Sequence, residues 1–199
     1  EMAVMIKKVG VIGSGQMGNG IAHVAALAGY DVALHDVSPD RLKSAMATIN
    51  GNLTRQAAKN VITEAAHKKA LSRIEANESL DGLADCDLVI ETAIEKEDVK
   101  RKIFQDLCAI LKPEAIIGSD TSSISITRLA ASTDRPERFI GIHFMNPVPL
   151  MELVELVRGI ATDDATFEAA REFVTSLGKQ IAVSEDFPAF IVNRILLPM

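Results

Sequence analysis

Three glycines and one acid at a fixed spacing are the residues of this chain whose types most directly suggest chemistry. Gly13, Gly15 and Gly18 form a G-x-G-x-x-G sequence, and Asp36 follows eighteen residues after the third glycine. In a strand-to-helix turn, the first glycine permits a tight bend, the second lets the backbone approach a pyrophosphate, and the third lets the helix pack closely on its strand. The free N–H groups and the dipole of such a helix favour a bound phosphate.

The surrounding residues predict the strand–helix–strand unit that must position these glycines. Lys8–Ile12 is a short apolar run of the kind buried in a parallel sheet, and Asp31–His35 is a second such run that ends beside Asp36. Between them lies an apolar stripe at helical spacing, closed by Gly29; its members are Met17, Ile21, Val24, Ala25 and Ala28.

A glycine-rich turn without a ligand is the alternative reading, because an isolated G-x-G-x-x-G is weak evidence. The agreement of strand, helix, spacing and acid instead favours a dinucleotide site. Gln16 and Met17 lie in the turn over residues 13–18, which we call the phosphate turn. Asp36 would accept hydrogen bonds from the adenosine ribose 2′-OH and repel a 2′-phosphate. We therefore expect NAD rather than NADP as the cofactor.

The rest of the chain alternates short apolar runs with helical patterns, which predicts an α/β fold with a Rossmann-type, doubly wound, mostly parallel sheet. A long helical pattern over residues 39–72, opened by Ser38 and Pro39, predicts a hairpin inserted after the second strand and interrupted near Asn60. A later helix is capped by residues 162–164 and stopped by Gly178. Further strands are expected near residues 73–75, 88–91, 116–119, 139–143, 151–157 and 180–183.

Composition excludes several classes of protein. The chain has 199 residues and a formal net charge of −6, which argues against nucleic acid as a partner. No window of about twenty uncharged apolar residues predicts a membrane span. Cys86 and Cys108 lack a metal-binding spacing and are expected to be buried thiols. We expect no metal, because the histidines are scattered; they are His23, His35, His67 and His143.

Positive charge is concentrated in the expected hairpin. Residues 41–73 hold seven basic side chains and one acid, so this segment carries +6 and the rest of the chain −12. A local cationic patch on an acidic protein is typical of a small polyanionic ligand. Solvated faces of two amphipathic helices are the alternative.

The two ends predict a fragment. Residues 1–2 read as an expression scar followed by the start residue. Residues 1–187 are expected to form one NAD-binding and catalytic domain, and residues 188–199 to begin a helix that leads into an absent helical domain. The apolar side chains of that helix have nothing downstream to cover them.

Three further motifs follow the glycines in order: Ser119–Ile124 (SDTSSI), His143–Glu155 (HFMNPVPLMELVE) and Pro188–Arg194 (PAFIVNR). Together the four motifs resemble the N-terminal domain of the L-3-hydroxyacyl-CoA dehydrogenases, most closely the bacterial 3-hydroxybutyryl-CoA branch. The resemblance implies a cytoplasmic oxidoreductase of fatty-acid metabolism. It would transfer a hydride between NAD and C3 of an (S)-3-hydroxyacyl-CoA. A C-terminal helical domain would close over the acyl-CoA and form a homodimer.

The resemblance also implies that His143 is the catalytic acid and base and that Glu155 holds it. Histidine titrates near neutral pH and can take and return the hydroxyl proton. His143 lies at the carboxyl end of a predicted strand, where open α/β sheets bind ligands, and Glu155 would orient its imidazole. A structural histidine beside a solvated edge-strand glutamate is the alternative.

Other site residues are carried over from the resemblance alone. Ser122 and Asn193 would position the substrate, although a plain helix N-cap is an alternative for Ser122. The cofactor would be contacted by Glu95, Lys100, Ser122 and Asn146, although the two charged residues would otherwise pass for surface charges. Asn52 and Lys59 would contact CoA, with Arg55 one turn before Lys59.

Two residues depart from the family pattern. Asp120 stands where Asn is usual and is expected to add a negative charge near the nicotinamide pocket. Ala189 stands where Gly is usual and is expected to narrow the approach to Asn193. Two other functions stay open: a gulonate-type hydroxy-acid dehydrogenase, and a catalytically incompetent NAD-binding module.

Overall fold

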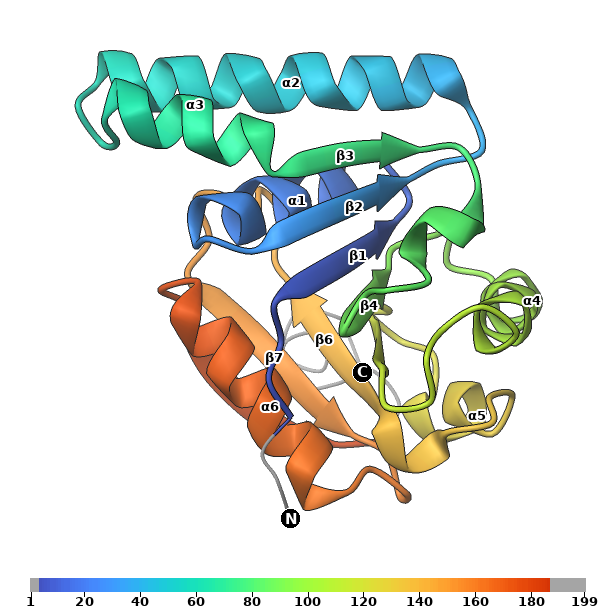
Figure 1. Ribbon diagram of the computed structural model, residues 1–199. Coiled ribbons are helices and arrows are strands. Elements are labelled where there is room, and N and C mark those ends of the chain that lie inside the picture. Colours follow the sequence, from blue (N-terminus) through green and yellow to red (C-terminus); the bar gives the residue numbers. More distant parts are fainter. Residues whose placement is uncertain (1–3, 187–199) are drawn as a thin grey trace.

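The computed structural model describes residues 4–186, which form one eight-stranded sheet with helices on both faces (Figure 1). The strands are β1 (Lys8–Ile12), β2 (Asp31–His35), β3 (Ile74–Asn77), β4 (Leu88–Glu91), β5 (Ile116–Ser119), β6 (Phe139–Phe144), β7 (Leu153–Arg158) and β8 (Gln180–Glu185). Their order across the sheet is β3-β2-β1-β4-β5-β6-β7-β8.

Six of the strands, β1 to β6, run parallel, as the Rossmann-type prediction requires. β7 pairs antiparallel with β6, and β8 runs parallel to β7 at the edge. The central strands are almost continuously apolar and buried, which is typical of a sheet that is covered on both faces.

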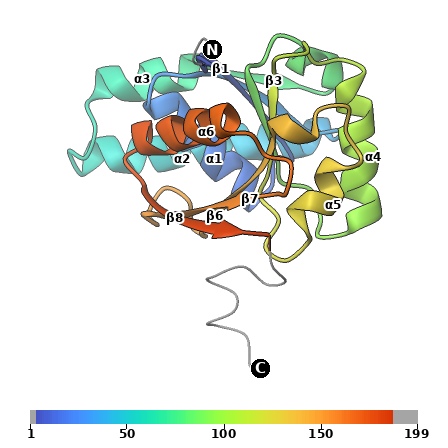
Figure 2. The ribbon, with the colours of Figure 1, turned by 90° about the horizontal axis from the view of Figure 1, so that it is seen from below.

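The helices are α1 (Gln16–Leu27), α2 (Pro39–Ala58), α3 (Glu64–Ser72), α4 (Glu97–Cys108), α5 (Ile126–Ala130) and α6 (Asp164–Ser176), with short 3-10 turns at Leu80–Leu83 and Pro136–Arg138. Helices α1, α2, α3 and α6 cover one face and share one apolar core. Helices α4 and α5 cover the other face with a second core. Figure 2 shows α6 lying across β6, β7 and β8.

The predicted helix caps and turns are confirmed. Ser38 accepts a hydrogen bond from the Arg41 N–H at the start of α2, and Asp163 caps α6 in the same way. The hairpin turns at Asn60, whose φ of 57° is the left-handed conformation that Asn tolerates. Gly178, with φ 77°, ends α6.

Strand boundaries differ from the prediction by one or two residues. β3, β6 and β8 extend further, and β7 begins at Leu153 rather than at Met151. Residues 151 and 152 are exposed and precede the pairing with β6, which begins at Val154. Strand pairing decides these limits, whereas the alternation of apolar residues that predicted them is a local signal.

Candidate active site at the carboxyl edge of the sheet

The carboxyl ends of the parallel strands bring most of the predicted site residues to one edge of the sheet. β1 ends before Gly13, β2 before Asp36, and β5 before the turn that contains Ser122. His143 is the second-last residue of β6. Ligands of open α/β sheets bind at this edge.

The phosphate turn has the geometry that its glycines predict. Gly13 has φ 93°, a conformation that favours glycine. A Cβ on Gly18 would lie 1.6 Å from the carbonyl oxygen of Gly13, so α1 can pack on this turn only without a side chain there. A Cβ on Gly15 would meet nothing within 4 Å, so the missing side chain faces open space that a ligand can approach.

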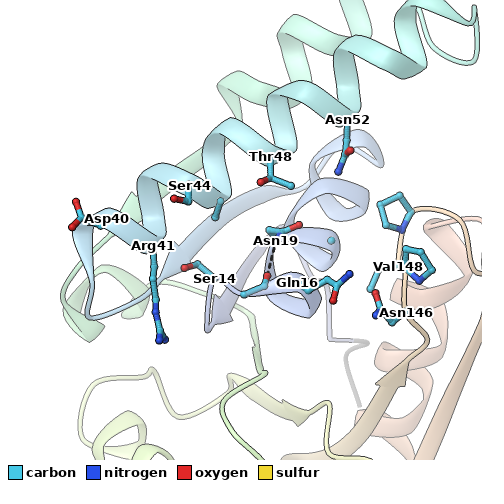
Figure 3. Close-up of a pocket in the computed structure, with 15 residues that line it drawn as sticks. Ser14, Gln16, Asn19, Asp40, Arg41, Ser44, Thr48, Asn52, Asn146 and Val148 are labelled. Carbon is cyan, nitrogen blue, oxygen red and sulfur yellow. Dashed lines mark hydrogen bonds between the residues drawn. The ribbon is translucent and has the colours of Figure 1, made fainter.

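The start of α1 is suited to an anion. Gly15 is its N-cap residue, and within the described residues no side chain caps the helix and its first turn holds no acid. Asn19 donates its side-chain N–H to the Gly15 carbonyl at 2.7 Å and stabilises the turn without occupying the N–H groups (Figure 3). These N–H groups and the helix dipole fit the pyrophosphate of NAD.

Asp36 is held in place as a carboxylate. One oxygen accepts hydrogen bonds from the Ser14 N–H at 3.1 Å and the Ser14 hydroxyl at 2.9 Å, and the other accepts one from the Ser38 N–H at 3.0 Å. Burial opposes the charged form, but these hydrogen bonds outweigh it and lower the pKa of Asp36. A carboxylate has about four acceptor positions, which leaves capacity for a ribose hydroxyl.

A cavity of about 700 Å³ opens beside the phosphate turn. Its lining comes from the start of α1, from the face of α2 that carries Ser44, Thr48 and Asn52, and from the loop that follows β6 (Figure 3). Of the residues predicted to bind cofactor or substrate, it includes Gly15, Gln16, Asn52 and Asn146. Its described lining excludes Met17, Arg55 and Lys59.

His143 and Glu155 face each other directly across the β6–β7 pair. Nδ1 of His143 lies 3.3 Å from Oε1 of Glu155. Glu155 is fully buried and His143 is 8% exposed. The strand that carries Glu155 is not the edge of the sheet, because β8 pairs with β7. The alternative of a solvated edge-strand glutamate is therefore wrong.

Ser122 is joined to Glu95. The Ser122 N–H and hydroxyl both donate to Oε2 of Glu95 at 2.8 Å, and Thr121 donates to the other oxygen at 2.7 Å. Burial opposes the charge of Glu95, but these hydrogen bonds and Lys100 lower its pKa. The helix that follows is capped by Ser125, which accepts from the Arg128 N–H, so the plain N-cap alternative for Ser122 is wrong.

Lys100 is not a surface charge, as it would seem in isolation. Its side chain is 2% exposed, and Nζ lies 2.6 Å from Glu91 Oε2, 3.0 Å from the Ala93 carbonyl and 3.6 Å from Glu95 Oε1. Glu91, fully buried at the end of β4, also accepts from the Ser119 hydroxyl at 2.7 Å. Sequence reasoning missed Glu91, although an acid that closes the apolar run Leu88–Ile90 was an available signal.

Asp120 is a third acidic residue of this region, close enough to Glu91 and Glu95 to interact with them electrostatically. Its Oδ1 accepts a hydrogen bond from the Phe144 N–H at 2.8 Å. Burial, reinforced by the charges of Glu91 and Glu95, raises the pKa of Asp120 well above its usual value. This shift favours the neutral form and opposes the negative charge that the sequence predicted.

Several other predictions have different outcomes. Asn193 and Ala189 lie outside the described residues, as do the whole Pro188–Arg194 motif and the helix expected over residues 188–199. In the hairpin, Arg55 donates to the side-chain oxygen of Asn52, and both Arg55 and Lys59 are exposed. Cys86 is buried, which raises its pKa to about 12, whereas Cys108 is only half-buried.

Neither a metal-ligand cluster nor a membrane-spanning helix is present in residues 4–186. No group of three or more His, Cys, Asp or Glu side chains there could hold a metal ion. No helix in the same range is both long enough and apolar enough to cross a bilayer.

Known proteins of one family match almost the whole chain. Residues 8–187 match the family described as 3-hydroxyacyl-CoA dehydrogenase, NAD binding domain. A 3-hydroxybutyryl-CoA dehydrogenase of Bradyrhizobium diazoefficiens is 83% identical over 198 residues, which cover 100% of this chain and 68% of that protein. A probable 3-hydroxybutyryl-CoA dehydrogenase of Deinococcus radiodurans is 47% identical, over 96% of this chain and 69% of its own length.

Solved structures give the same result. The crystal structure of (S)-3-hydroxybutyryl-CoA dehydrogenase PaaH1 from Ralstonia eutropha has a TM-score of 0.94 and 46% identity. The match covers 96% of this chain and 68% of that one. This chain thus spans about two thirds of the length of the relatives it matches.

Proposed function

This chain belongs to the 3-hydroxyacyl-CoA dehydrogenase family, of which it holds the NAD-binding domain, and we propose that it transfers a hydride between NAD and C3 of an (S)-3-hydroxyacyl-CoA. The four-carbon pair, 3-hydroxybutyryl-CoA and acetoacetyl-CoA, is the proposed substrate pair. The observation that carries the proposal is the buried contact between His143 and Glu155 at the carboxyl edge of the sheet. When bound, NAD supplies the hydride acceptor for oxidation and NADH the donor for reduction.

His143 is the proposed acid and base. With the Nδ1–H donated to Glu155, Nε2 is the basic nitrogen of the neutral ring. It takes the proton of the C3 hydroxyl while the hydride leaves C3, and the C3–O bond becomes a carbonyl. In the reverse direction the imidazolium returns that proton to the oxygen. General acid–base catalysis of this kind contributes about 10²–10⁴-fold to a rate.

Glu155 is proposed to act through His143. Its carboxylate fixes the orientation of the ring and stabilises the imidazolium that forms when the hydroxyl proton arrives. Because Glu155 is fully buried, solvent screens this interaction little.

Ser122 is proposed to position the reacting oxygen. The one hydrogen of the C3 hydroxyl goes to His143, so Ser122 would turn its own hydroxyl hydrogen from Glu95 to the C3 oxygen when substrate binds, while its N–H keeps the contact with Glu95. Lys100 and Glu91 hold Glu95 and the neighbouring turn in place. Asn193 is the proposed partner of Ser122.

Phosphate chemistry accounts for the remaining site residues. The phosphate turn and Asp36 are proposed to bind NAD, and Asn146 and Gln16 to line the same space. The exposed cations Arg55, in the last turn of α2, and Lys59, just after it, are proposed with Asn52 to contact the phosphates of CoA. Arg73 of the basic segment donates to the Ala26 carbonyl and is not proposed as a CoA contact.

The proposed setting is a cytoplasmic homodimer. The family resemblance supports this assembly, because in the family the C-terminal helical domain forms the dimer interface, so the dimer is proposed for a chain that includes that domain. Sedimentation analysis is expected to give a dimer mass for the protein, and a monomer at all concentrations would contradict the assembly.

Initial rates of NADH formation test the substrate. We expect turnover of (S)-3-hydroxybutyryl-CoA and at least about 100-fold lower kcat/KM for free 3-hydroxybutyrate and for gulonate, because neither engages a CoA site. Equal rates on gulonate would establish the hydroxy-acid dehydrogenase instead. Binding of NADH without turnover of any of the three would establish the incompetent NAD-binding module.

A further inference from the structure

The strand pairing beside His143 is completed by a side chain. Register between β5 and β6 ends at Ser119 and Gly141, although β6 continues to Phe144. Beyond that point Oδ1 of Asp120 accepts the Phe144 N–H at 2.8 Å. Asp120 thus fixes the peptide group that joins His143 to Phe144 from the β5 side, while β7 holds the same strand from the other side.

The surroundings of this carboxyl are already negative. Glu91 of β4 and Glu95 of the following loop lie close enough to interact with it electrostatically. Lys100 of α4 lies 2.6 Å from Glu91 and 3.6 Å from Glu95 and forms its ion pairs with these two residues. Its charge also favours ionisation of Asp120, but from beyond ion-pair distance, and burial and the two carboxylates outweigh it.

The described residues of the adjoining strands supply no cation that forms an ion pair with Asp120. His143 precedes the hydrogen-bonded peptide on β6 and pairs with Glu155 on β7 at 3.3 Å. Among the described residues, no Lys, Arg or His lies within ion-pair distance of Asp120. A further carboxylate in a partly desolvated acidic cluster is unfavourable, because like charges and burial both oppose ionisation.

We propose that Asp120 works as a neutral carboxyl that positions His143: its carbonyl oxygen holds the Phe144 N–H without adding a third negative charge beside Glu91 and Glu95. In this form the group has the hydrogen-bonding pattern of an amide, with one oxygen accepting and the other carrying a hydrogen. The role given to His143 rests on the proposed function, whereas the protonation state of Asp120 does not.

The pH dependence of stability tests the protonation state without substrate or cofactor. A carboxyl whose pKa is raised by folding contributes stability that is complete below its unfolded value, near 3.8, and is lost as the pH rises through the folded value. Asp120→Asn keeps the acceptor and cannot ionise. The variant is therefore expected to gain thermal stability over the natural protein between pH 4 and pH 8.

The expected gain in melting temperature is about 3–5 °C for each pH unit above the unfolded pKa, up to the folded pKa. Asp87→Asn is the matched control, because Asp87 accepts hydrogen bonds from the backbone N–H groups of Lys7 and Lys8 and from Lys112, and its pKa is lowered. That control is expected to lose stability over the same pH range. No gain, or a loss, for Asp120→Asn would overturn the neutral form.

Kinetics test the positioning role. Asp120→Ala removes the acceptor of the Phe144 N–H and is expected to lower kcat about tenfold, with most of the loss restored in Asp120→Asn. Because Asp120→Asn removes no charge from a neutral group, the acid limb of the kcat/KM profile is expected to stay at the same pH. A shift of that limb to lower pH would show a lost negative charge and overturn the proposal. A protein without turnover would contradict the proposed function but leave the thermal result decisive for Asp120.

Discussion

Nδ1 of His143 lies 3.3 Å from Oε1 of Glu155, and the two residues are direct partners in the antiparallel pairing of β6 with β7. This relationship depends on the single reversal of direction in the central sheet. A strand parallel to β6 would require a crossover connection, whereas the short loop after β6 returns β7 alongside it. The chain thereby brings residues 143 and 155 together at the edge where ligands bind.

Glu155→Gln is expected to lower kcat by roughly 10²-fold, because the amide cannot stabilise an imidazolium as a carboxylate does. Loss of the charge also favours the neutral ring, so the acid limb of the kcat/KM profile for oxidation should move to lower pH. Glu152→Gln, an exposed position just before β7, is the matched control and should leave the profile in place. An unaltered profile in Glu155→Gln would show that the pair has no part in the proton transfer.

Gly15→Ala and Gly18→Ala separate binding from folding. The Gly15 variant should fold with an unchanged melting temperature, because its Cβ meets nothing within 4 Å and its φ is −67°. Its Kd for NADH should rise at least about tenfold, a loss of about 1.4 kcal/mol, as the methyl group intrudes on the pyrophosphate.

The Gly18 variant places a Cβ 1.6 Å from a backbone oxygen and should lose about 1–3 kcal/mol or more of unfolding free energy. Fluorescence titration and thermal melts measure the two effects. Native NADH affinity in Gly15→Ala would rule out this turn as the phosphate site.

Asp36→Asn should narrow the preference for NADH over NADPH by roughly tenfold, because it removes the charge that repels a 2′-phosphate. The amide still offers one oxygen to Ser14 or Ser38. Asp31→Asn, at the exposed opposite end of β2, is the control. A preference unchanged in both variants would place the adenosine ribose elsewhere.

Lys100→Met should destabilise the protein by about 3–5 kcal/mol, because it leaves the buried carboxylate of Glu91 without its cation. Lys102→Met on the same helix breaks only the exposed pair with Asp106 and should cost about 0.2–1 kcal/mol. Urea unfolding of both variants measures the contrast. Equal losses would mean that the stability contributed by the Glu91–Lys100 pair does not depend on its burial.

The features predicted from sequence are those with local causes. The glycine turn, the two strands around it, the hairpin at Asn60 and the capped helix α6 follow from residues that are neighbours in the chain. They appear in the structure with nearly the predicted limits, because turn and cap chemistry acts over only a few residues.

The electrostatic features could not be predicted in the same way. Lys100 sits among charged residues at the start of α4, and only the packing of α4 beside β4 reveals that it is buried against Glu91. The raised pKa of Asp120 could not be predicted from sequence for the same reason, since its neighbours Glu91 and Glu95 are far from it in sequence. Site roles that came from the family resemblance stay predictions for the measurements above.

The central claim is tested most directly by the reduction of acetoacetyl-CoA with NADH in His143→Ala. The account predicts that kcat falls by about 10²–10⁴-fold while the Kd for NADH changes less than about twofold, because the imidazole moves the proton and the phosphate turn binds the cofactor. Turnover of His143→Ala at the rate of the natural protein, with NADH bound normally, would contradict the account.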